Sequence, residues 1–263
     1  MSMSTPDRAW LPAPLQAAID GFGRTEDVLV AVDFDGVLSE IVEQRSAARP
    51  LPASTRALER LSTAPGTRVA LVSGRTLQDL VARAQPTAAM AVIASHGAET
   101  AGVDLRLNAA QVRLRDEVVT AMQTIWSRCP GTDLEVKPIG AALHTRLAER
   151  DVALHATATA LLGPARLPGA HPVVGKEVVE IRVTSLTKGD AVTALQDQLH
   201  PDATLYIGDD VTDEDAFAVL GPGDVGIKVG PGPTAAQYRL PDPQSVARLL
   251  TDLADTRSTG EAP

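Results

Sequence analysis

The segment Val28-Leu29-Val30-Ala31-Val32-Asp33-Phe34-Asp35-Gly36-Val37-Leu38 decides the predicted fold. Its first five residues are all apolar, and two aspartates and a glycine follow almost at once. A short apolar run that ends in turn residues is typical of a strand buried on both faces of a parallel sheet. We therefore expect a strand over Val28–Val32 whose carboxyl end carries two acidic side chains.

Four further apolar runs have the same character. They cover Arg68–Val72, Ala91–Ala94, Thr204–Ile207 and Val225–Val229, with helical patterns over Ser54–Ser62, Leu77–Arg83 and Gly189–Leu199. Strands that alternate with helices predict an α/β fold with a parallel sheet covered on both faces. Every run except Val225–Val229 ends in small or acidic residues, and ligands of such sheets bind beyond the carboxyl ends of the strands.

The middle of the chain has a different pattern. Helices are expected over Ala109–Trp126 and Asp151–Leu162, and strands over Leu134–Val136, Ala141–Leu147 and Val178–Val183. This α+β pattern predicts that residues 109–183 form a domain inserted into a discontinuous core of residues 1–108 and 184–263. The polar segment Thr256–Pro263 is expected to be disordered.

Composition excludes several classes of protein. The chain has 263 residues, of which 44% are apolar and 22% charged, as in ordinary soluble domains. A net charge of −9 argues against nucleic acid and anionic membranes as partners. Cys129 is the single cysteine, so no intrachain disulfide can form. With no apolar stretch of about 18 residues, and no signal peptide within Met1–Leu11, we expect a cytoplasmic protein.

Asp33 and Asp35 follow the first strand directly and can share one polar pocket. Two close carboxylates repel each other, which raises one pKa, and a divalent cation removes that conflict. Asp33 could then attack phosphorus while Asp35 acts as a general acid and base. The alternative is a surface Asp-Gly turn.

The acidic segment Gly208-Asp209-Asp210-Val211-Thr212-Asp213-Glu214-Asp215 also follows an apolar strand. Carboxylate oxygens on a tight turn suit Mg²⁺, which usually binds one or two protein carboxylates and keeps several waters. The alternative is a helix N-terminus that favours acidic residues because of its dipole. That alternative explains Asp213 to Asp215 but explains Asp209 and Asp210 poorly.

Two further segments could bind phosphate. Ser73-Gly74-Arg75 opens a helix, and a hydroxyl beside exposed backbone N–H groups forms an anion site. Lys188 begins another helix and could place one positive charge on the phosphoryl oxygens. Taken alone, the first is also a common turn and the second could be a solvated lysine.

Together, the order of these four segments resembles the haloacid dehalogenase superfamily of phosphotransferases. Asp33 and Asp35 match its first motif, Ser73 the second, Lys188 the third, and Asp209 with Asp213 the fourth. The resemblance implies a Rossmann-like core with a parallel sheet and an inserted α+β cap. It implies Mg²⁺ held by Asp33, the Asp35 carbonyl and Asp209, with Asp210 and Asp213 behind them. Asp33, Asp35, Ser73 and Lys188 are then the catalytic residues.

A narrower likeness, from about Asp27 to Leu250, is to trehalose-6-phosphate phosphatases. It is carried by Leu71-Val72-Ser73-Gly74-Arg75, Ser95-His96-Gly97-Ala98-Glu99, Glu135-Val136-Lys137, His144-Thr145-Arg146, Gly175-Lys176, Glu180, Gly208 to Phe217, Val229-Gly230 and Thr234-Ala235. The likeness implies that Gly74, Arg75, His96, Glu99, Lys137, His144, Arg146, Lys176 and Glu180 bind the substrate. Two positions depart from it: the family usually has His-Tyr-Arg at His144-Thr145-Arg146 and often Arg-Pro at Arg182-Val183.

The favoured function is therefore hydrolysis of trehalose 6-phosphate through an aspartyl phosphate. One alternative is a phosphatase for a related disaccharide or pseudo-disaccharide phosphate. Another, from a different class, is a catalytically weak sugar-phosphate sensor docked on a synthase. The intact set Asp33, Asp35, Lys188 and Asp209 disfavours the sensor. The expected partner is a small sugar phosphate, with a functional link to a sugar-phosphate synthase.

Overall fold

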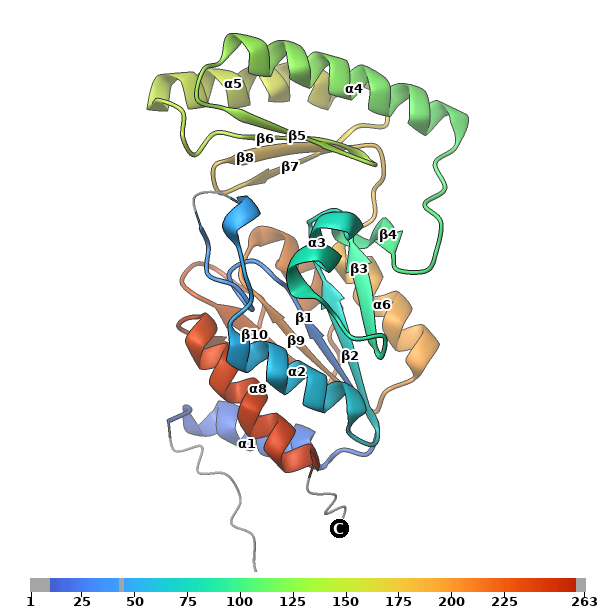
Figure 1. Ribbon diagram of the computed structural model, residues 1–263, viewed down its shortest axis with the longest axis vertical. Coiled ribbons are helices and arrows are strands. Elements are labelled where there is room, and N and C mark those ends of the chain that lie inside the picture. The colour runs from blue at the N-terminus through green and yellow to red at the C-terminus, as the bar shows by residue number, and fades with distance from the viewer. Residues whose placement is uncertain (1–9, 43–44, 259–263) are drawn as a thin grey trace, which may run out of the picture. The chain divides into compact units, whose positions relative to one another are not determined.

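The computed structural model describes residues 10–42 and 45–258. The chain divides into two compact units (Figure 1). The inserted unit is Gly102–Leu186, and the rest of the chain forms the core unit. These limits lie a few residues outside the expected 109–183.

A seven-stranded sheet forms the centre of the core unit. Its strands are β1 (Val28–Val32), β2 (Thr67–Val72), β3 (Met90–Ala94), β4 (Glu99–Thr100), β9 (Ala203–Gly208), β10 (Val225–Val229) and β11 (Tyr238–Leu240). Their order is β11-β10-β9-β1-β2-β3-β4, and all neighbours are parallel except β4 on β3. Because β2 and β9 lie on opposite sides of β1, the direction of winding reverses there.

Helices cover both faces of this sheet (Figure 1). The helices are α1 (Ala13–Arg24), α2 (Pro52–Thr63), α3 (Leu77–Ala84), α6 (Lys188–Leu199), α7 (Glu214–Ala218) and α8 (Pro243–Ser258). Successive side chains of a strand point to opposite faces. Val28, Val30 and Val32 accordingly pack with α1, α2, α3 and α8, whereas Leu29 and Ala31 pack with α6 and α7.

The inserted unit is a four-stranded antiparallel sheet with helices on one face. Its strands are β5 (Asp133–Lys137), β6 (Gly140–His144), β7 (His171–Gly175) and β8 (Val178–Arg182), in the order β5-β6-β8-β7. Its helices are α4 (Ala109–Arg128) and α5 (Arg150–Leu162). Ala141, Leu143, Val179 and Ile181 form the buried face that packs with these helices.

The structure confirms the predicted strands and helices of the core to within two residues at each end. The strand expected over Ala141–Leu147 is too long, because it ends at His144 and Ala148 closes a turn on the carbonyl of Thr145. Sequence patterns missed α1, α8, β4, β7 and β11. Among the described helices, none has the length and apolar character needed to cross a membrane.

The expectation of a disordered segment from Thr256 is wrong for its first three residues. Thr256–Ser258 complete the last turn of α8. Arg257 is only 9% exposed, and its guanidinium donates to the Thr67 hydroxyl and to carbonyl oxygens of Thr25 and Glu26. These contacts stabilise the last turn of α8, whose polar sequence alone would not stabilise it. Residues 259–263 lie outside the described part of the chain.

Candidate active site

The candidate site lies at the carboxyl ends of β1 and β9, where the direction of winding reverses. Asp33 and Asp35 follow β1, and Asp209 follows β9. The two strands pair in parallel, with Val32 opposite Ile207, so their ends lie side by side. This is the position at which open α/β sheets bind their ligands.

Asp33 is a buried carboxylate paired with a buried lysine. Its side chain is 6% exposed, and Oδ2 lies 2.8 Å from Nζ of Lys188, which is 2% exposed. Oδ1 accepts a 2.6 Å hydrogen bond from the Phe34 backbone N–H. Lys188 is the first residue of α6, whose N-terminus is capped by Thr187 and Asp190. This N-terminal helix cap therefore fixes the position of the positively charged Lys188.

Lys188 also contacts Asp213, which has no oxygen left for another ligand. Oδ1 of Asp213 lies 2.8 Å from Lys188 and accepts a 2.6 Å bond from the Tyr206 hydroxyl. Oδ2 accepts the backbone N–H groups of Asp209 and Asp210 at 3.0 and 2.9 Å. These four contacts fill the roughly four lone-pair sites of a carboxylate. Asp213 therefore holds the turn and the lysine in place.

Paired charges also explain the pKa directions of these two groups. Burial disfavours the charge on both side chains, but their mutual attraction outweighs it. The pKa of Lys188 is raised by Asp213 and Asp33. The pKa of Asp213 is lowered by Lys188 and by hydrogen bonds from Lys188, Tyr206 and Asp210. Both groups are therefore charged at neutral pH.

The remaining carboxylates carry excess negative charge that fits a divalent cation. Asp33 and Asp209 place oxygens within 4.8 Å of each other and of an oxygen of the saturated Asp213. Burial, with the nearby carboxylates, raises the pKa of Asp33 to about 7 and that of Asp209 to about 8. Hard oxygen donors in such a group suit Mg²⁺. A bound cation would favour the charged form of both carboxylates and so lower both pKa values.

Gly36 allows Asp209 to approach the end of β1. Its φ is +70°, and a Cβ placed there would lie 2.1 Å from Oδ2 of Asp209. Any larger residue would displace the carboxylate, and an L side chain would also be strained at this φ. The glycine of the first motif therefore has a packing role in the site.

The segment Ser73-Gly74-Arg75 follows β2 and contacts the loop after β3. Ser73 is buried, and its Oγ accepts the backbone N–H of Arg75 at 3.3 Å. A Cβ on Gly74 would lie 2.5 Å from the His96 ring. Glu99 accepts the Ser95 hydroxyl at 2.5 Å and the Leu77 N–H at the start of α3 at 3.3 Å. His96 and Glu99 thus lie against the predicted phosphate-binding turn.

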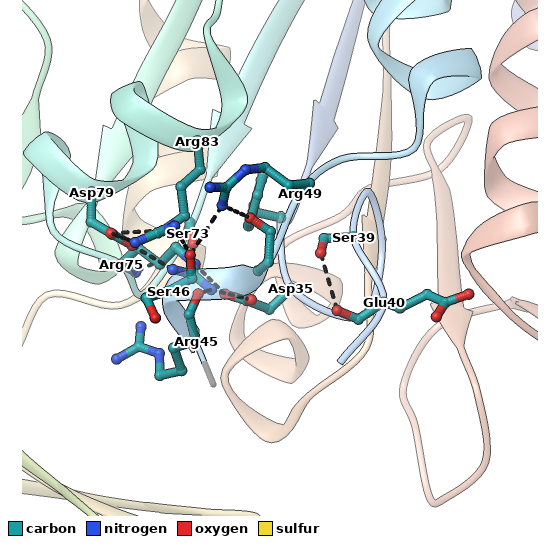
Figure 2. Close-up of polar contacts among 12 residues, drawn as sticks. Asp35, Ser39, Glu40, Arg45, Ser46, Arg49, Ser73, Arg75, Asp79 and Arg83 are labelled. Carbon is teal, nitrogen blue, oxygen red and sulfur yellow. Dashed lines mark hydrogen bonds and ion pairs between the residues drawn. The ribbon is translucent and has the colours of Figure 1, made fainter. Parts of the chain in front are cut away.

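Arg75 pairs with Asp35 rather than lying open to solvent (Figure 2). Its Nε and Nη2 donate to the two oxygens of Asp35, each at 2.7 Å. Nη1 donates to Asp79 on α3. Burial disfavours the charge of Arg75, yet these two carboxylates raise its pKa above the usual value.

The inserted unit groups its predicted substrate residues in two places. On the sheet face opposite α4 and α5, Lys137 lies 2.6 Å from Glu180, and His144 lies 3.2 Å from Glu135. Arg146 instead pairs with Glu177 at 2.8 Å, beside Lys176 in the exposed turn between β7 and β8. The substrate-binding residues predicted for the inserted unit therefore divide into a group on the sheet face and a group at the turn.

Sequence reasoning missed several residues that belong to these networks. Among them are Tyr206, Asp79, Lys228 and Glu177. Lys228 is buried in β10 and its Nζ donates to the Asp209 carbonyl. A lysine inside the apolar run Val225–Val229 and a tyrosine inside β9 were the available signals, because a buried polar atom needs a partner.

Residues 31–244 match the family described as trehalose-phosphatase. The chain belongs to this family. The matched range begins inside β1 and includes the predicted catalytic and metal-binding residues Asp33, Asp35, Ser73, Lys188 and Asp209.

Relatives of this trehalose-phosphatase family member extend the match over most of the chain. It is 34% identical to the trehalose-phosphate phosphatase of Mycobacterium tuberculosis, over 100% of this chain and 71% of that protein. It is 33% identical to a bifunctional trehalose-6-phosphate synthase/phosphatase of Thermoproteus tenax, over 88% of this chain. The chain spans only 32% of the length of that bifunctional relative.

Solved structures support the haloacid dehalogenase fold of the trehalose-phosphatase chain. The C-terminal domain of the Candida albicans trehalose-6-phosphate phosphatase superposes with a TM-score of 0.81 at 24% identity, covering 97% of this chain and 99% of that one. A sugar phosphatase of haloacid dehalogenase subclass IIB superposes with a TM-score of 0.56 at 14% identity, covering 84% and 96%. At these identities the likeness concerns the fold alone.

Proposed function

We propose that the chain hydrolyses trehalose 6-phosphate to trehalose and phosphate. The observation that carries this proposal is the group of Asp33, Lys188 and Asp209 at the ends of β1, α6 and β9, in a chain of the trehalose-phosphatase family. A nucleophile, a fixed cation and a metal ligand are the parts that transfer of a phosphoryl group requires.

The proposed reaction has two steps. An oxygen of Asp33 attacks phosphorus and the bond from phosphorus to the sugar oxygen breaks, while Asp35 gives a proton to that oxygen. Asp35 then takes a proton from a water, which attacks phosphorus and releases Asp33. Lys188, the Ser73 hydroxyl and the backbone of Gly74 stabilise the charge on the phosphoryl oxygens. Burial of Asp33 and Lys188 strengthens this attraction.

The donors of the site support Mg²⁺ as the cofactor. The carboxylates of Asp33 and Asp209 and the carbonyl of Asp35 would hold the ion, while Asp213, whose oxygens are occupied, and Asp210 support this loop. When bound, the ion supplies positive charge to the phosphoryl group and keeps Asp33 ionised.

The inserted unit is proposed to be a cap that binds the sugar. Lys137, Glu180 and His144 offer donors and acceptors on one sheet face, and Arg146 and Lys176 offer cations at the neighbouring turn. Within the core unit, His96 and Glu99 are further candidates for substrate contacts, because they lie beside the predicted phosphate-binding turn. A disaccharide presents many hydroxyls, each of which needs a partner when buried.

The substitution of the family tyrosine by Thr145 keeps one alternative open, a related disaccharide phosphate as substrate. A bifunctional relative that carries a synthase and a phosphatase in one chain supports a functional link between this chain and a sugar-phosphate synthase. The link concerns supply of the substrate, and it requires no contact between the proteins.

The decisive experiment measures phosphate release from a panel of sugar phosphates, with Mg²⁺ and with EDTA. We expect trehalose 6-phosphate to give the highest kcat/KM and EDTA to stop the reaction until Mg²⁺ is restored. A higher kcat/KM for another disaccharide phosphate would mean that this compound, and not trehalose 6-phosphate, is the substrate. If folded protein loaded with Mg²⁺ releases phosphate from none of these compounds, the proposed function is contradicted.

A further inference from the structure

Arg75 has almost no capacity left to bind a substrate. Its side chain is 1% exposed. Of the five N–H donors of a guanidinium, two bond Asp35, one bonds Asp79 and one bonds the carbonyl of Arg45. One donor remains, so Arg75 could bind a phosphate through two N–H groups only by displacing one of these partners. The contacts of Arg75 therefore serve the protein itself.

The contact with Asp35 is bidentate. The two hydrogen bonds are both 2.7 Å and run from Nε and Nη2 to different oxygens of the carboxylate. Such a fork fixes the plane of the carboxylate as well as its distance. Without it, Asp35 is a side chain that is 38% exposed in the loop after β1, and it could rotate about both of its χ angles.

Arg75 is itself held from behind. Its guanidinium carbon lies 5.1 Å from the centre of the Phe34 ring, and Asp79 of α3 accepts its Nη1. Asp79 is in turn held by Arg83, one turn further along α3, at 2.7 Å. The alternating charges Asp35, Arg75, Asp79 and Arg83 form one continuous row from the end of β1 to α3 (Figure 2).

The same row contacts the short 3₁₀ helix η1 (Arg45–Ala47) between β1 and α2. Arg75 donates to the Arg45 carbonyl at 3.1 Å, and Arg83 donates to the Ser46 carbonyl. Arg75 therefore connects the Asp35 loop, η1 and α3, which are segments far apart in the sequence. A rigid support of this kind is what a group that transfers protons requires.

We infer that Arg75 is the positioning residue of the general acid and base Asp35. The inference rests on the role of Asp35 in the proposed function. Each carboxylate oxygen has two lone pairs, and Arg75 occupies one on each. The second lone pair of either oxygen can hold the proton for the leaving group or take one from water. Asp35 can thus transfer a proton while it is hydrogen-bonded to Arg75.

The test follows the second step alone, because the aspartyl phosphate is the same whatever ester formed it. Enzyme with Mg²⁺ is phosphorylated by ³²P-labelled p-nitrophenyl phosphate, and the decay of the phosphoenzyme is followed by rapid quenching in acid. We expect Arg75→Met to slow the decay about 30- to 300-fold, as loss of an aligned general base does. Asp35→Asn should slow it at least as much.

The double variant decides between positioning and independent roles. If Arg75 acts through Asp35, adding Arg75→Met to Asp35→Asn changes the decay less than about threefold, since coupled residues are not additive. A double variant slowed by the product of the two single effects would overturn the inference. A decay within threefold of wild type in Arg75→Met would also overturn it.

Two further variants control for the fold. Arg83→Met removes an arginine that contacts Asp79 and Ser46 but not Asp35, and it should leave the decay within threefold of wild type. An equal loss in Arg83→Met and Arg75→Met would contradict the inference. Arg75→Lys keeps the charge and replaces the methionine variant if that variant does not fold. It should still slow the decay about 10-fold, because an ammonium cannot form the fork.

These results are separate from the fate of the proposed substrate. A wild-type enzyme that forms and hydrolyses the phosphoenzyme from p-nitrophenyl phosphate, yet releases no phosphate from trehalose 6-phosphate, would contradict the proposed substrate. The comparison of Arg75 and Asp35 variants would stand in that case.

Discussion

The two units use charged side chains in different ways. In the core unit, one lysine serves two carboxylates, and Asp209 adds a third close by. In the inserted unit, two carboxylates meet Lys137 and His144 on one sheet face. Lys137 lies 2.6 Å from Glu180 and 3.9 Å from Glu135, and Glu135 also contacts His144. The first arrangement leaves excess negative charge for a cation, whereas the second leaves donors and acceptors for neutral hydroxyls.

This difference indicates a division of labour. In the proposed function, Asp33, Lys188 and Asp209 act on a metal and a phosphoryl group, and every phosphate ester contains a phosphoryl group. They cannot distinguish one sugar from another. Discrimination between sugars must come from groups that pair with hydroxyls far from phosphorus, and the sheet face of the inserted unit is our proposed source. Variants in each unit should therefore change different kinetic quantities.

The largest effect is expected from Asp33→Asn in the core unit. The amide has the same shape but is a poor nucleophile, so turnover of every ester should fall by at least about 1,000-fold. Phosphate release from trehalose 6-phosphate and p-nitrophenyl phosphate checks this, with the melting temperature as a control for folding. Residual turnover above about a tenth of wild type would remove Asp33 as the nucleophile.

A selective effect is expected from Glu180→Ala in the inserted unit. The change removes the 2.6 Å contact of Lys137 with Glu180 and takes an acceptor away from a sugar hydroxyl, at a cost of about 2–4 kcal/mol in the transition state. The value of kcat/KM for trehalose 6-phosphate should fall about 30- to 1,000-fold, while p-nitrophenyl phosphate is nearly unaffected. Glu117→Ala, on the exposed side of α4, is the matched control and should change neither substrate.

Equal losses on both substrates in Glu180→Ala would end the division of labour, because Glu180 would then support the fold or the phosphoryl site. A loss on trehalose 6-phosphate in Glu117→Ala as large as that in Glu180→Ala would mean that any charge change in this unit has the same effect.

A third test uses pH and the excess charge of the core unit. The pKa of Asp33 is raised to about 7 and that of Asp209 to about 8, mainly by burial. Between pH 5 and 8 the folded metal-free protein therefore binds more protons than the unfolded chain. Its free energy of unfolding should fall as pH rises through this window, by a few kcal/mol.

Mg²⁺ should reverse that loss, and the readout is thermal unfolding without any substrate. The melting temperature should rise by several degrees on adding Mg²⁺ at pH 8, and by much less at pH 5.5, where protons compete. Asp209→Asn should abolish most of the rise. A rise equal at both pH values would show that the cation does not bind these carboxylates.

The smallest effect on chemistry is expected from Arg257, a buried charge far from the site in sequence. Arg257→Met removes hydrogen bonds to Thr67 and to several carbonyl oxygens that join α8 to the loops before β1 and β2. Stability should fall by about 2–3 kcal/mol, measured by urea unfolding. At 25 °C, kcat should stay within twofold. A large fall in kcat in folded protein would mean that this end of the sheet influences the site.

The sequence predicted the core well because its signals are local. Five apolar runs with turn residues at their ends located five of the seven strands. The short edge strands β4 and β11 carry too few residues for such a pattern, and α1 and α8 lie in segments that the motif argument did not cover. Candidate catalytic residues were identified because each stands at the end of a strand or the start of a helix.

The partners of those residues depended on the tertiary structure. Arg75 and Asp35 are 40 positions apart, and they meet because β1 and β2 are neighbours in the sheet. A motif alone suggested substrate binding for Arg75, and nothing in its local sequence indicated a buried fork to Asp35. The polar turn at Thr256 is helical for the same reason, since Arg257 bonds segments distant in sequence.

The sequence by itself identified the candidate residues for chemistry and the strand ends at which they lie. The spacing of apolar residues and the positions of glycine and acidic residues are local signals that extend over a few neighbouring positions. They can therefore be recognised in the sequence alone. Only the tertiary structure decided that Asp213 is saturated by Lys188, Tyr206 and two backbone N–H groups, leaving Asp33 and Asp209 with the excess charge. Pairing of buried charges depends on strand order and helix packing, because each partner comes from a different element.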